Sequence, residues 1–141
     1  MMTSEVNLAK DLQIKLMQNL EALESSTDLE GTALVTKMGL RIASSTHAST
    51  DVDQHSASPA AIVNLAEKVS QGLEYGNLKQ IVVAGEQGYT IITTKDDSNF
   101  MLLSHSKKAA KLGYYFHRLR KAFDKLTGLL VDIKLGEASY S

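Results

Sequence analysis

Three apolar runs in the second half of the chain constrain its fold most. The runs are Ile81–Ala84, Ile91–Ile92 and Met101–Leu103, and each places apolar residues at consecutive positions. Successive residues of a β-strand point to opposite faces of a sheet, so a sheet made from these runs must be covered on both faces. Antiparallel sheets more often leave one face to solvent. The chain therefore needs helices on both sides of one sheet.

The first and last helices are predicted from stripes of large apolar residues at helical spacing. One helix is expected over about residues 4–23, with Ser4 as its N-cap, and the other over about residues 107–126. The stripes are Leu8, Leu12, Leu16, Leu20 and Leu23 in the first and Leu112, Phe116, Leu119, Phe123 and Leu126 in the last. Residues 129–135 fit either a helical continuation or an extended segment, and residues 136–141 are expected to be frayed.

A middle helix is predicted to begin at Ser58 and Pro59, an N-cap followed by a first-turn proline, and to end before Gly76. Its apolar stripe consists of Ile62, Leu65, Ala66, Val69 and Leu73, while Asn64, Glu67, Lys68, Gln71 and Glu74 are expected to face away.

The residues before this helix form a predicted loop from Ser45 to Ala57, which is long for a compact domain. Its acidic and histidine residues are His47, Asp51, Asp53 and His55. Their spacing does not place ligands on one side of a helix or knuckle, and these are ordinary loop residues. We therefore expect neither a metal site nor another cofactor.

Five strands are predicted at residues 32–37, 40–44, 78–84, 89–94 and 99–104. The first two are joined by Met38 and Gly39, where Gly39 can take the positive φ of a tight turn and Met38 is left exposed at the tip. Gly85 and Gly88 are expected to form a turn rather than a phosphate loop, because a phosphate loop must open a helix and Tyr89 opens a strand. The element order is α-β-β-α-β-β-β-α, which predicts an α/β (α+β) fold with a central five-stranded antiparallel sheet covered by helices on both faces.

Composition narrows the class of protein. The chain has 141 residues, no cysteine and a net charge of −1, so disulfides are excluded and no global attraction to nucleic acid is expected. No apolar run approaches the roughly 20 residues of a membrane span, and the N-terminus lacks the pattern of a signal peptide. We expect a cytoplasmic protein without membrane insertion. One domain is expected over residues 1–127, followed by a tail at 128–141.

Charge is nevertheless uneven along the chain. Residues 1–30 carry six acidic side chains, whereas residues 107–125 carry seven basic ones. The simplest explanation is that the first and last helices share one face of the sheet, with Glu21 and Glu24 opposite Arg118 and Lys121. A nucleic-acid surface is the alternative, but it would call for aromatic residues on an open sheet or for a groove-reading helix, and this sheet is apolar.

Three segments carry a family resemblance: Ala33–Ser44, Ile81–Thr90, and Leu112–Gly113 followed by Leu119–Arg120. With the element order, they make the chain resemble the roadblock/dynein light chain family over roughly residues 5–127. The resemblance implies a dimer in which the third strands pair edge to edge and the middle helices pack side by side. Such modules bind or regulate small GTPases: they are GTPase activators in bacterial gliding motility, and dynein light chains and lysosomal scaffold subunits in eukaryotes.

The leading hypothesis is a non-enzymatic homodimeric adaptor that binds a Ras-like small GTPase. Its expected dimer interface consists of Ile62, Leu65, Val69, Leu73, Ile81 and Val83, and its expected partner site of His47, Asp51, Asn64, Glu67, Lys68 and Gln71. A small-ligand-sensing domain of the profilin/PAS-like class is the alternative, although the apolar sheet offers no evident polar lining for a cavity. A hydrolase is disfavoured, because no nucleophile-elbow motif accompanies the serines and histidines.

Overall fold

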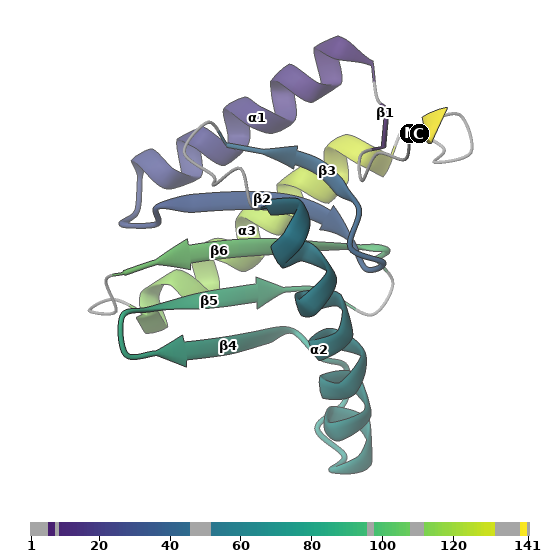
Figure 1. The fold of residues 1–141 in the computed structure, drawn as a ribbon, viewed down its shortest axis with the longest axis vertical. Helices are drawn as coiled ribbons and strands as arrows, with labels where there is room; N and C mark the ends of the chain where they lie inside the picture. The colour runs from purple at the N-terminus through teal and green to yellow at the C-terminus, as the bar shows by residue number, and fades with distance from the viewer. Residues whose placement is uncertain are drawn as a thin grey trace.

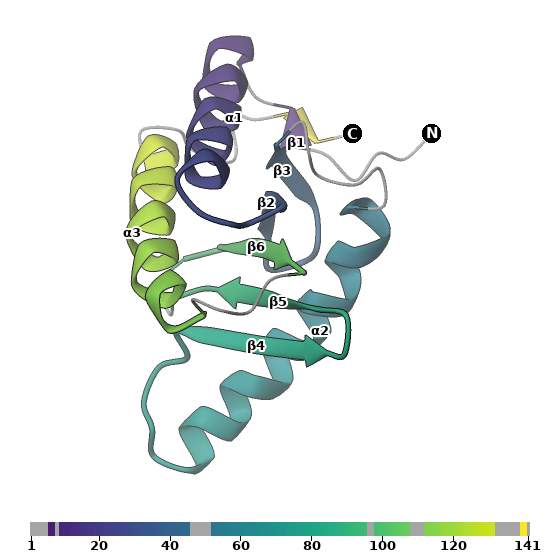
Figure 2. The ribbon, with the colours of Figure 1, turned by 90° about the vertical axis from the view of Figure 1, so that its left-hand side faces the viewer.

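The computed structural model describes residues 6–7, 9–45, 52–95, 98–107, 112–131 and 139–140. The elements are β1 (Val6–Asn7), α1 (Lys10–Ser25), β2 (Gly31–Thr36), β3 (Arg41–Ser44), α2 (Val52–Gly72), β4 (Gln80–Gly85), β5 (Gly88–Thr93), β6 (Phe100–Ser106), α3 (Leu112–Val131) and β7 (Ser139–Tyr140). Five strands form one antiparallel sheet of order β3-β2-β6-β5-β4. Helices α1 and α3 lie side by side on one face and α2 lies on the other (Figures 1 and 2). The predicted fold class is confirmed.

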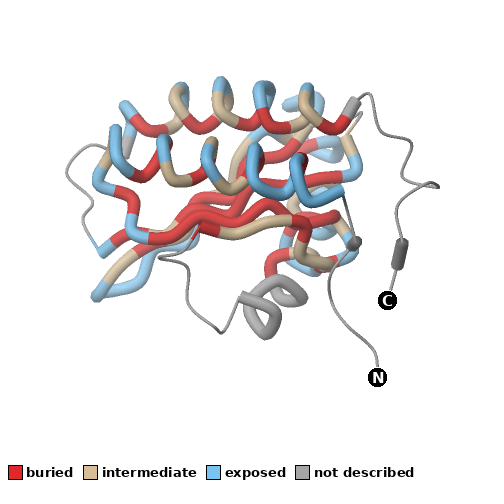
Figure 3. The backbone as a smooth tube through the Cα atoms, turned by 90° about the horizontal axis from the view of Figure 1, so that it is seen from above, coloured by how far each residue is buried: buried red, intermediate tan, exposed pale blue. Residues whose placement is uncertain are grey.

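The central strands are buried on both faces, as the apolar runs predicted. Neighbouring residues Ile91 and Ile92 of β5 point to opposite faces, and each is almost fully buried. Ile91 belongs to the core beneath α1 and α3, whereas Ile92 belongs to a smaller core beneath α2. Seen from above, α1 and α3 bury their inner sides and expose their outer sides (Figure 3).

The larger core contains an aromatic residue that the apolar stripe did not include. Tyr115 is buried, and its hydroxyl oxygen accepts a hydrogen bond of 2.9 Å from the backbone N–H of Asp28, just after α1. Burial raises the pKa of Tyr115, so this hydroxyl stays neutral at physiological pH. Phe116, which the stripe did include, is only partly buried. The true inward face of α3 is thus rotated slightly from the predicted one.

Helix α2 differs most from its prediction. It begins at Val52 rather than Ser58, so Pro59 lies inside the helix and much of the expected loop is helical. Proline is favoured in the first turn of a helix but can also lie in its interior at a cost in stability. The Ser58-Pro59 pair alone therefore does not show whether a helix begins there or continues through it. The helix also ends earlier, at Gly72, and the chain then turns with positive φ at Glu74 and at Gly76.

The ends of the chain also depart from expectation. Helix α1 begins at Lys10 after Ala9, which makes no side-chain cap, and the expected cap Ser4 lies outside the described residues. The prediction that the chain is frayed at residues 139–140 is wrong, because these residues form β7, which pairs with β1. Helix α3 continues through residue 128 to Val131, which favours the helical alternative for the start of that segment.

The predicted proximity of α1 and α3 is confirmed, but not the expected pairing of their charges. Glu24 points into the core, where its carboxylate accepts a hydrogen bond of 2.5 Å from the Thr32 hydroxyl. Arg118 instead donates to Ser26, at the end of α1. Apolar packing and hydroxyl contacts therefore hold the two helices together here, since an ion pair between exposed side chains contributes only about 0–1 kcal/mol.

The first prediction compares two apolar residues of α1. Leu16 is fully buried, whereas the side chain of Ile14 is 39% exposed. We expect Leu16→Ala to lower the free energy of unfolding by about 2–5 kcal/mol, because it removes buried methyl groups and leaves a cavity. Ile14→Ala, the matched control, should cost less than about 1 kcal/mol. Urea denaturation measures both values, and equal losses would contradict the assignment of the α1 core face.

A second prediction concerns the Tyr115 hydroxyl. Tyr115→Phe keeps the ring but leaves the Asp28 N–H without its acceptor. We expect a loss of about 0.5–1.5 kcal/mol in unfolding free energy, the net contribution of a typical hydrogen bond, because Asp28 is exposed and its N–H can bond to water instead. Tyr114→Phe, which removes an exposed hydroxyl that accepts a hydrogen bond from Arg118, serves as the control and should change stability by less than about 0.5 kcal/mol. An unchanged midpoint for Tyr115→Phe would contradict a structural role for this bond.

Candidate functional site

Helix α2 extends past the edge of its own sheet. It crosses the sheet on the face opposite α1 and α3, and its C-terminal part continues beyond β4 (Figures 1 and 2). Val63 packs into the smaller core and is 1% exposed, whereas Leu65, only two residues later, is 66% exposed. The sheet of a single chain therefore covers one side of this helix and leaves much of its apolar surface open.

The sheet-facing side of α2 is not the apolar stripe. Val63 and Ser70 are buried against the body of the protein, and Glu67 is turned toward it as well. The Glu67 carboxylate lies 3.7 Å from the Lys37 amine at the end of β2. The expectation that Glu67 faces away is therefore wrong.

The stripe that was assigned to a dimer interface is solvent-exposed in the single chain. Ile62, Leu65, Val69 and Leu73 are all exposed, and Tyr75 follows them at 75% exposure. These side chains lie three or four positions apart and so share one side of the helix. Sequence reasoning missed Tyr75, because it lies beyond the helix and outside any periodic pattern.

Strand β4 adds to this exposed apolar surface. It pairs with β5 on one side, and no other described strand pairs with its outer edge. Its residues Val82 and Val83 point to opposite faces, and both are exposed, Val83 at 45%. Ile81 is half-buried and packs at the margin of the smaller core.

We use the name α2–β4 surface for seven apolar residues of this region, of which six are exposed and one, Ile81, is half-buried. It consists of Ile62, Leu65, Val69, Leu73, Tyr75, Ile81 and Val83. A hollow of about 390 Å³ lies within it, lined by Leu65, Val69, Tyr75, Leu78 and Ile81 among others. Contiguous exposed apolar area of this kind marks an interaction site on a soluble domain.

The predicted partner residues are only partly brought together. Asn64, Lys68 and Gln71 are exposed along one side of α2, next to the apolar stripe. Gln71 also donates a hydrogen bond of 3.1 Å to the side chain of Asn77. Glu67 is separated from them by its contact with Lys37, and both His47 and Asp51 lie outside the described residues.

This arrangement of exposed apolar and polar side chains suits contact with another protein. Within the described ranges, no group of three or more His, Cys, Asp or Glu residues could hold a metal ion. The turn from Gly85 to Gly88 joins β4 to β5, which confirms that it is a hairpin connection. No described helix has the length and apolarity needed to cross a membrane.

The chain is similar in sequence or in fold to several known proteins. The chain is 27% identical over 107 residues to the uncharacterized protein MJ0310 of Methanocaldococcus jannaschii, covering 76% of this chain and 92% of that protein. It is similar in fold to an MglB with a tetrameric arrangement, with a TM-score of 0.76, 15% identity and coverage of 88% of this chain and 93% of that one. It is also similar in fold to the gliding protein MglB of Thermus thermophilus, with a TM-score of 0.73, 15% identity and coverage of 87% and 96%.

At these identities the two structures establish the fold alone. The family follows from the sequence itself, because the model of the Roadblock/LC7 domain matches residues 15–104. That match spans more than half of the chain. It includes all of β2, β3, β4 and β5, and β6 up to residue 104. The chain therefore belongs to the Roadblock/LC7 domain family.

Proposed function

We propose that this protein is a homodimeric, non-enzymatic roadblock-type adaptor that binds and regulates a Ras-like small GTPase. The observation that carries the proposal is the α2–β4 surface, where an overhanging apolar helix lies beside an open strand edge. Family membership supports the role, because roadblock domains resembling this one bind or regulate small GTPases. The similarity in fold to MglB proteins points in the same direction.

A second copy of the chain is the occupant that fits the α2–β4 surface best. An exposed strand edge presents unpaired backbone N–H and C=O groups that pair readily with another strand. Pairing β4 with its own copy about a two-fold axis would continue the sheet and bring the partner's strands beneath the overhanging part of α2. The two α2 helices would then lie side by side, each covering what the other exposes.

The energetics favour this dimer over a free monomer. Burial of a Leu or Val side chain contributes roughly 1.5–3 kcal/mol, and Leu65, Val69 and Leu73 would all become buried together with Val83. Because these gains must also offset the loss of translational and side-chain freedom, we expect an interface on the order of 1,600 Å² or larger.

The GTPase site we propose lies along the polar side of α2 next to this dimer seam. Asn64, Lys68 and Gln71 are exposed there, and dimerisation would repeat them across the two-fold axis. One GTPase could then contact both copies, which makes a complex of two adaptor chains and one GTPase the expected stoichiometry. His47 and Asp51, which lie outside the described residues, precede α2 in sequence and belong to the same proposed site.

Any effect on GTP hydrolysis would act through the GTPase itself. An arginine finger must reach the transferring phosphate, but the arginines of this chain stand in regular elements. Arg41 lies in β3, and Arg118 and Arg120 lie in α3, on the face of the sheet opposite α2 (Figure 2). Stimulation would therefore come from ordering the GTPase switch loops rather than from a residue supplied in trans.

The dimer is tested by placing charge in the seam. Leu65→Glu combined with Val69→Glu should convert the protein to a monomer, because symmetry brings like charges together where apolar burial is lost. Sedimentation velocity at micromolar concentration should give about twice the chain mass of 15.4 kDa for the unsubstituted protein and a single chain mass for the variant.

Ile14→Glu, on α1 and thus on the opposite face, is the control for this test. It introduces one glutamate at an exposed apolar position outside the seam and should leave the dimer mass unchanged. Far-ultraviolet circular dichroism checks that each variant keeps its fold. A monomeric mass for the unsubstituted protein would refute the proposed dimer.

The GTPase site is tested with charge changes that leave the seam intact. Lys68→Glu with Gln71→Glu should weaken binding of a small GTPase by roughly tenfold, about 1.4 kcal/mol, because both side chains would lie in the contact. Calorimetry against small GTPases encoded in the same genome, loaded with a non-hydrolysable GTP analogue, measures this change.

Glu67 is left unchanged in this test because its substitution would also break the ion pair with Lys37. The matched control is Lys121→Glu with Lys125→Glu on α3, which should not alter GTPase affinity. If the α2 variant remains dimeric and binds as tightly as the original chain, α2 does not form the GTPase site.

A further inference from the structure

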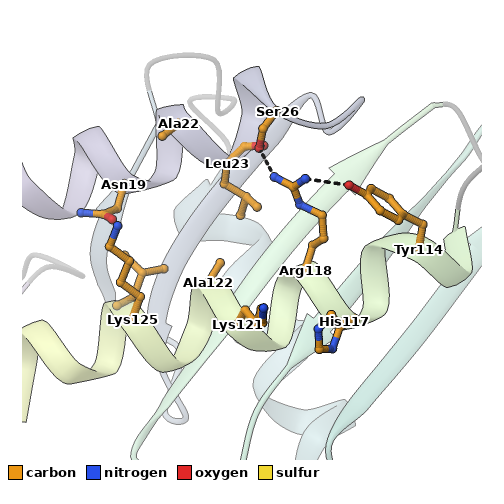
Figure 4. A pocket seen from close by; sticks show the side chains of 11 residues that line it. Asn19, Ala22, Leu23, Ser26, Tyr114, His117, Arg118, Lys121, Ala122 and Lys125 are labelled. Carbon is orange, nitrogen blue, oxygen red and sulfur yellow. Dashed lines mark hydrogen bonds between the residues drawn. The ribbon is translucent and has the colours of Figure 1, made fainter.

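A basic groove lies on the opposite face of the protein, between α1 and α3 (Figure 4). It has a volume of about 460 Å³. One wall comes from α3 and carries Arg118, Lys121 and Lys125, whereas the facing wall comes from α1 and carries the neutral polar residues Asn19 and Ser26. We call this feature the α1–α3 groove. It is separate from the α2–β4 surface and accounts for much of the basic segment seen in the sequence.

Arg118 is held in a fixed position at the groove by neutral groups. Its guanidinium donates a hydrogen bond of 2.7 Å to the Tyr114 hydroxyl and one of 2.5 Å to the Ser26 hydroxyl. The guanidinium carbon also lies 5.5 Å from the centre of the Tyr114 ring. These contacts orient the side chain without neutralising its charge, and a guanidinium has five N–H donors, so donors remain for a ligand.

The lysines of the groove retain their charge as well. Lys121 and Lys125 are exposed, and no described carboxylate forms an ion pair with either of them. Lys95 contrasts with them, because its amine lies 2.6 Å from the carboxylate of Asp124 in α3. The α3 wall of the groove therefore carries three basic side chains that form no ion pair with a described carboxylate.

A second hollow extends the basic surface across α3. It has a volume of about 340 Å³ and shares His117 and Lys121 with the α1–α3 groove. Arg120 also lines this hollow, and its Nε atom is buried with no hydrogen-bond partner among the described residues. Asp124 also lines this hollow, where its carboxylate pairs with Lys95, so the hollow is less basic than the groove itself.

The base of the α1–α3 groove is apolar. Leu23 of α1 and Leu126 of α3 line it, and both are buried members of the larger core. The groove thus offers an apolar base, one cationic wall and one wall of hydrogen-bonding groups. An amphipathic peptide with acidic side chains matches all three, in the manner of a helix or strand laid into a groove.

We propose that the α1–α3 groove docks an acidic, amphipathic segment of a partner protein. A bilayer is a poorer match, because the flat surface of a membrane does not follow a groove between two helices, whereas a peptide segment does. Single-stranded nucleic acid binds through basic grooves with aromatic rings free for base stacking. Here Tyr114, the aromatic residue of the groove, lies against Arg118.

This docking site lies on the face of the sheet opposite α2 (Figure 2). A roadblock dimer that holds a GTPase along α2 could therefore carry an acidic partner on its other face at the same time. The inference does not depend on GTPase binding, and its test uses different substitutions.

The probe is a fluorescein-labelled helical peptide of about 15 residues, with leucines on one side and glutamates on the other. Its counterpart carries glutamine in place of every glutamate. We expect fluorescence anisotropy to show roughly tenfold tighter binding of the glutamate peptide to the full chain, with affinity falling as salt is raised. Lys121→Glu with Lys125→Glu should weaken that binding by at least about tenfold.

Lys10→Glu with Lys15→Glu is the charge-matched control, because both lysines are exposed on α1 and lie outside the groove. It should change peptide affinity by less than about twofold. Leu65→Glu with Val69→Glu should retain peptide binding even as a monomer, which separates this site from the proposed dimer and GTPase functions.

Three results would overturn the proposal. Equal binding of the glutamate and glutamine peptides would show that the basic wall plays no part. An equal loss in the control variant would show an effect of net charge alone. Binding of phosphatidylserine vesicles or single-stranded DNA, without binding of the glutamate peptide, would assign the groove to lipid or nucleic acid instead.

Discussion

The need to cover both faces of the central strands governs this structure. Strands β2, β6 and β5 are apolar on both sides, and burial on both faces requires helices above and below one sheet. Helices α1 and α3 together cover one face, whereas α2 covers the other alone. This unequal cover determines which surfaces remain open for partners.

A single helix that crosses a sheet leaves part of that face and of itself uncovered. Helix α2 passes beyond β4, where no strand of the described part of the chain lies beneath it (Figure 1). Its exposed stripe, including Leu65 and Val69, therefore reflects the length and direction of the helix rather than a poorly formed core. The open β4 edge lies beside that stripe, so the incomplete cover of one chain creates the surface that we assign to a second chain.

The opposite face is completed by two helices and has a different chemistry. Contact between α1 and α3 buries their large apolar residues and leaves a shallow groove between their outer sides. Because Glu24 points inward to Thr32, it does not neutralise the basic wall as the sequence suggested. The domain thus presents an apolar surface on one face and a cationic groove on the other, and each suits a different kind of partner.

Local sequence signals were sufficient for the elements whose conformation depends on near neighbours. The strands lie within about two residues of their predicted bounds, and Gly39 takes the positive φ that its turn requires. The apolar residues of the proposed seam were also identifiable, because helical spacing and excess apolarity are properties of the sequence.

Tertiary structure decided the rest. Val63 rather than Leu65 faces the sheet, Tyr115 rather than Phe116 fills the core, and Glu24 turns inward. Each choice depends on how a helix is rotated and positioned against groups far away in sequence, and helical periodicity specifies neither.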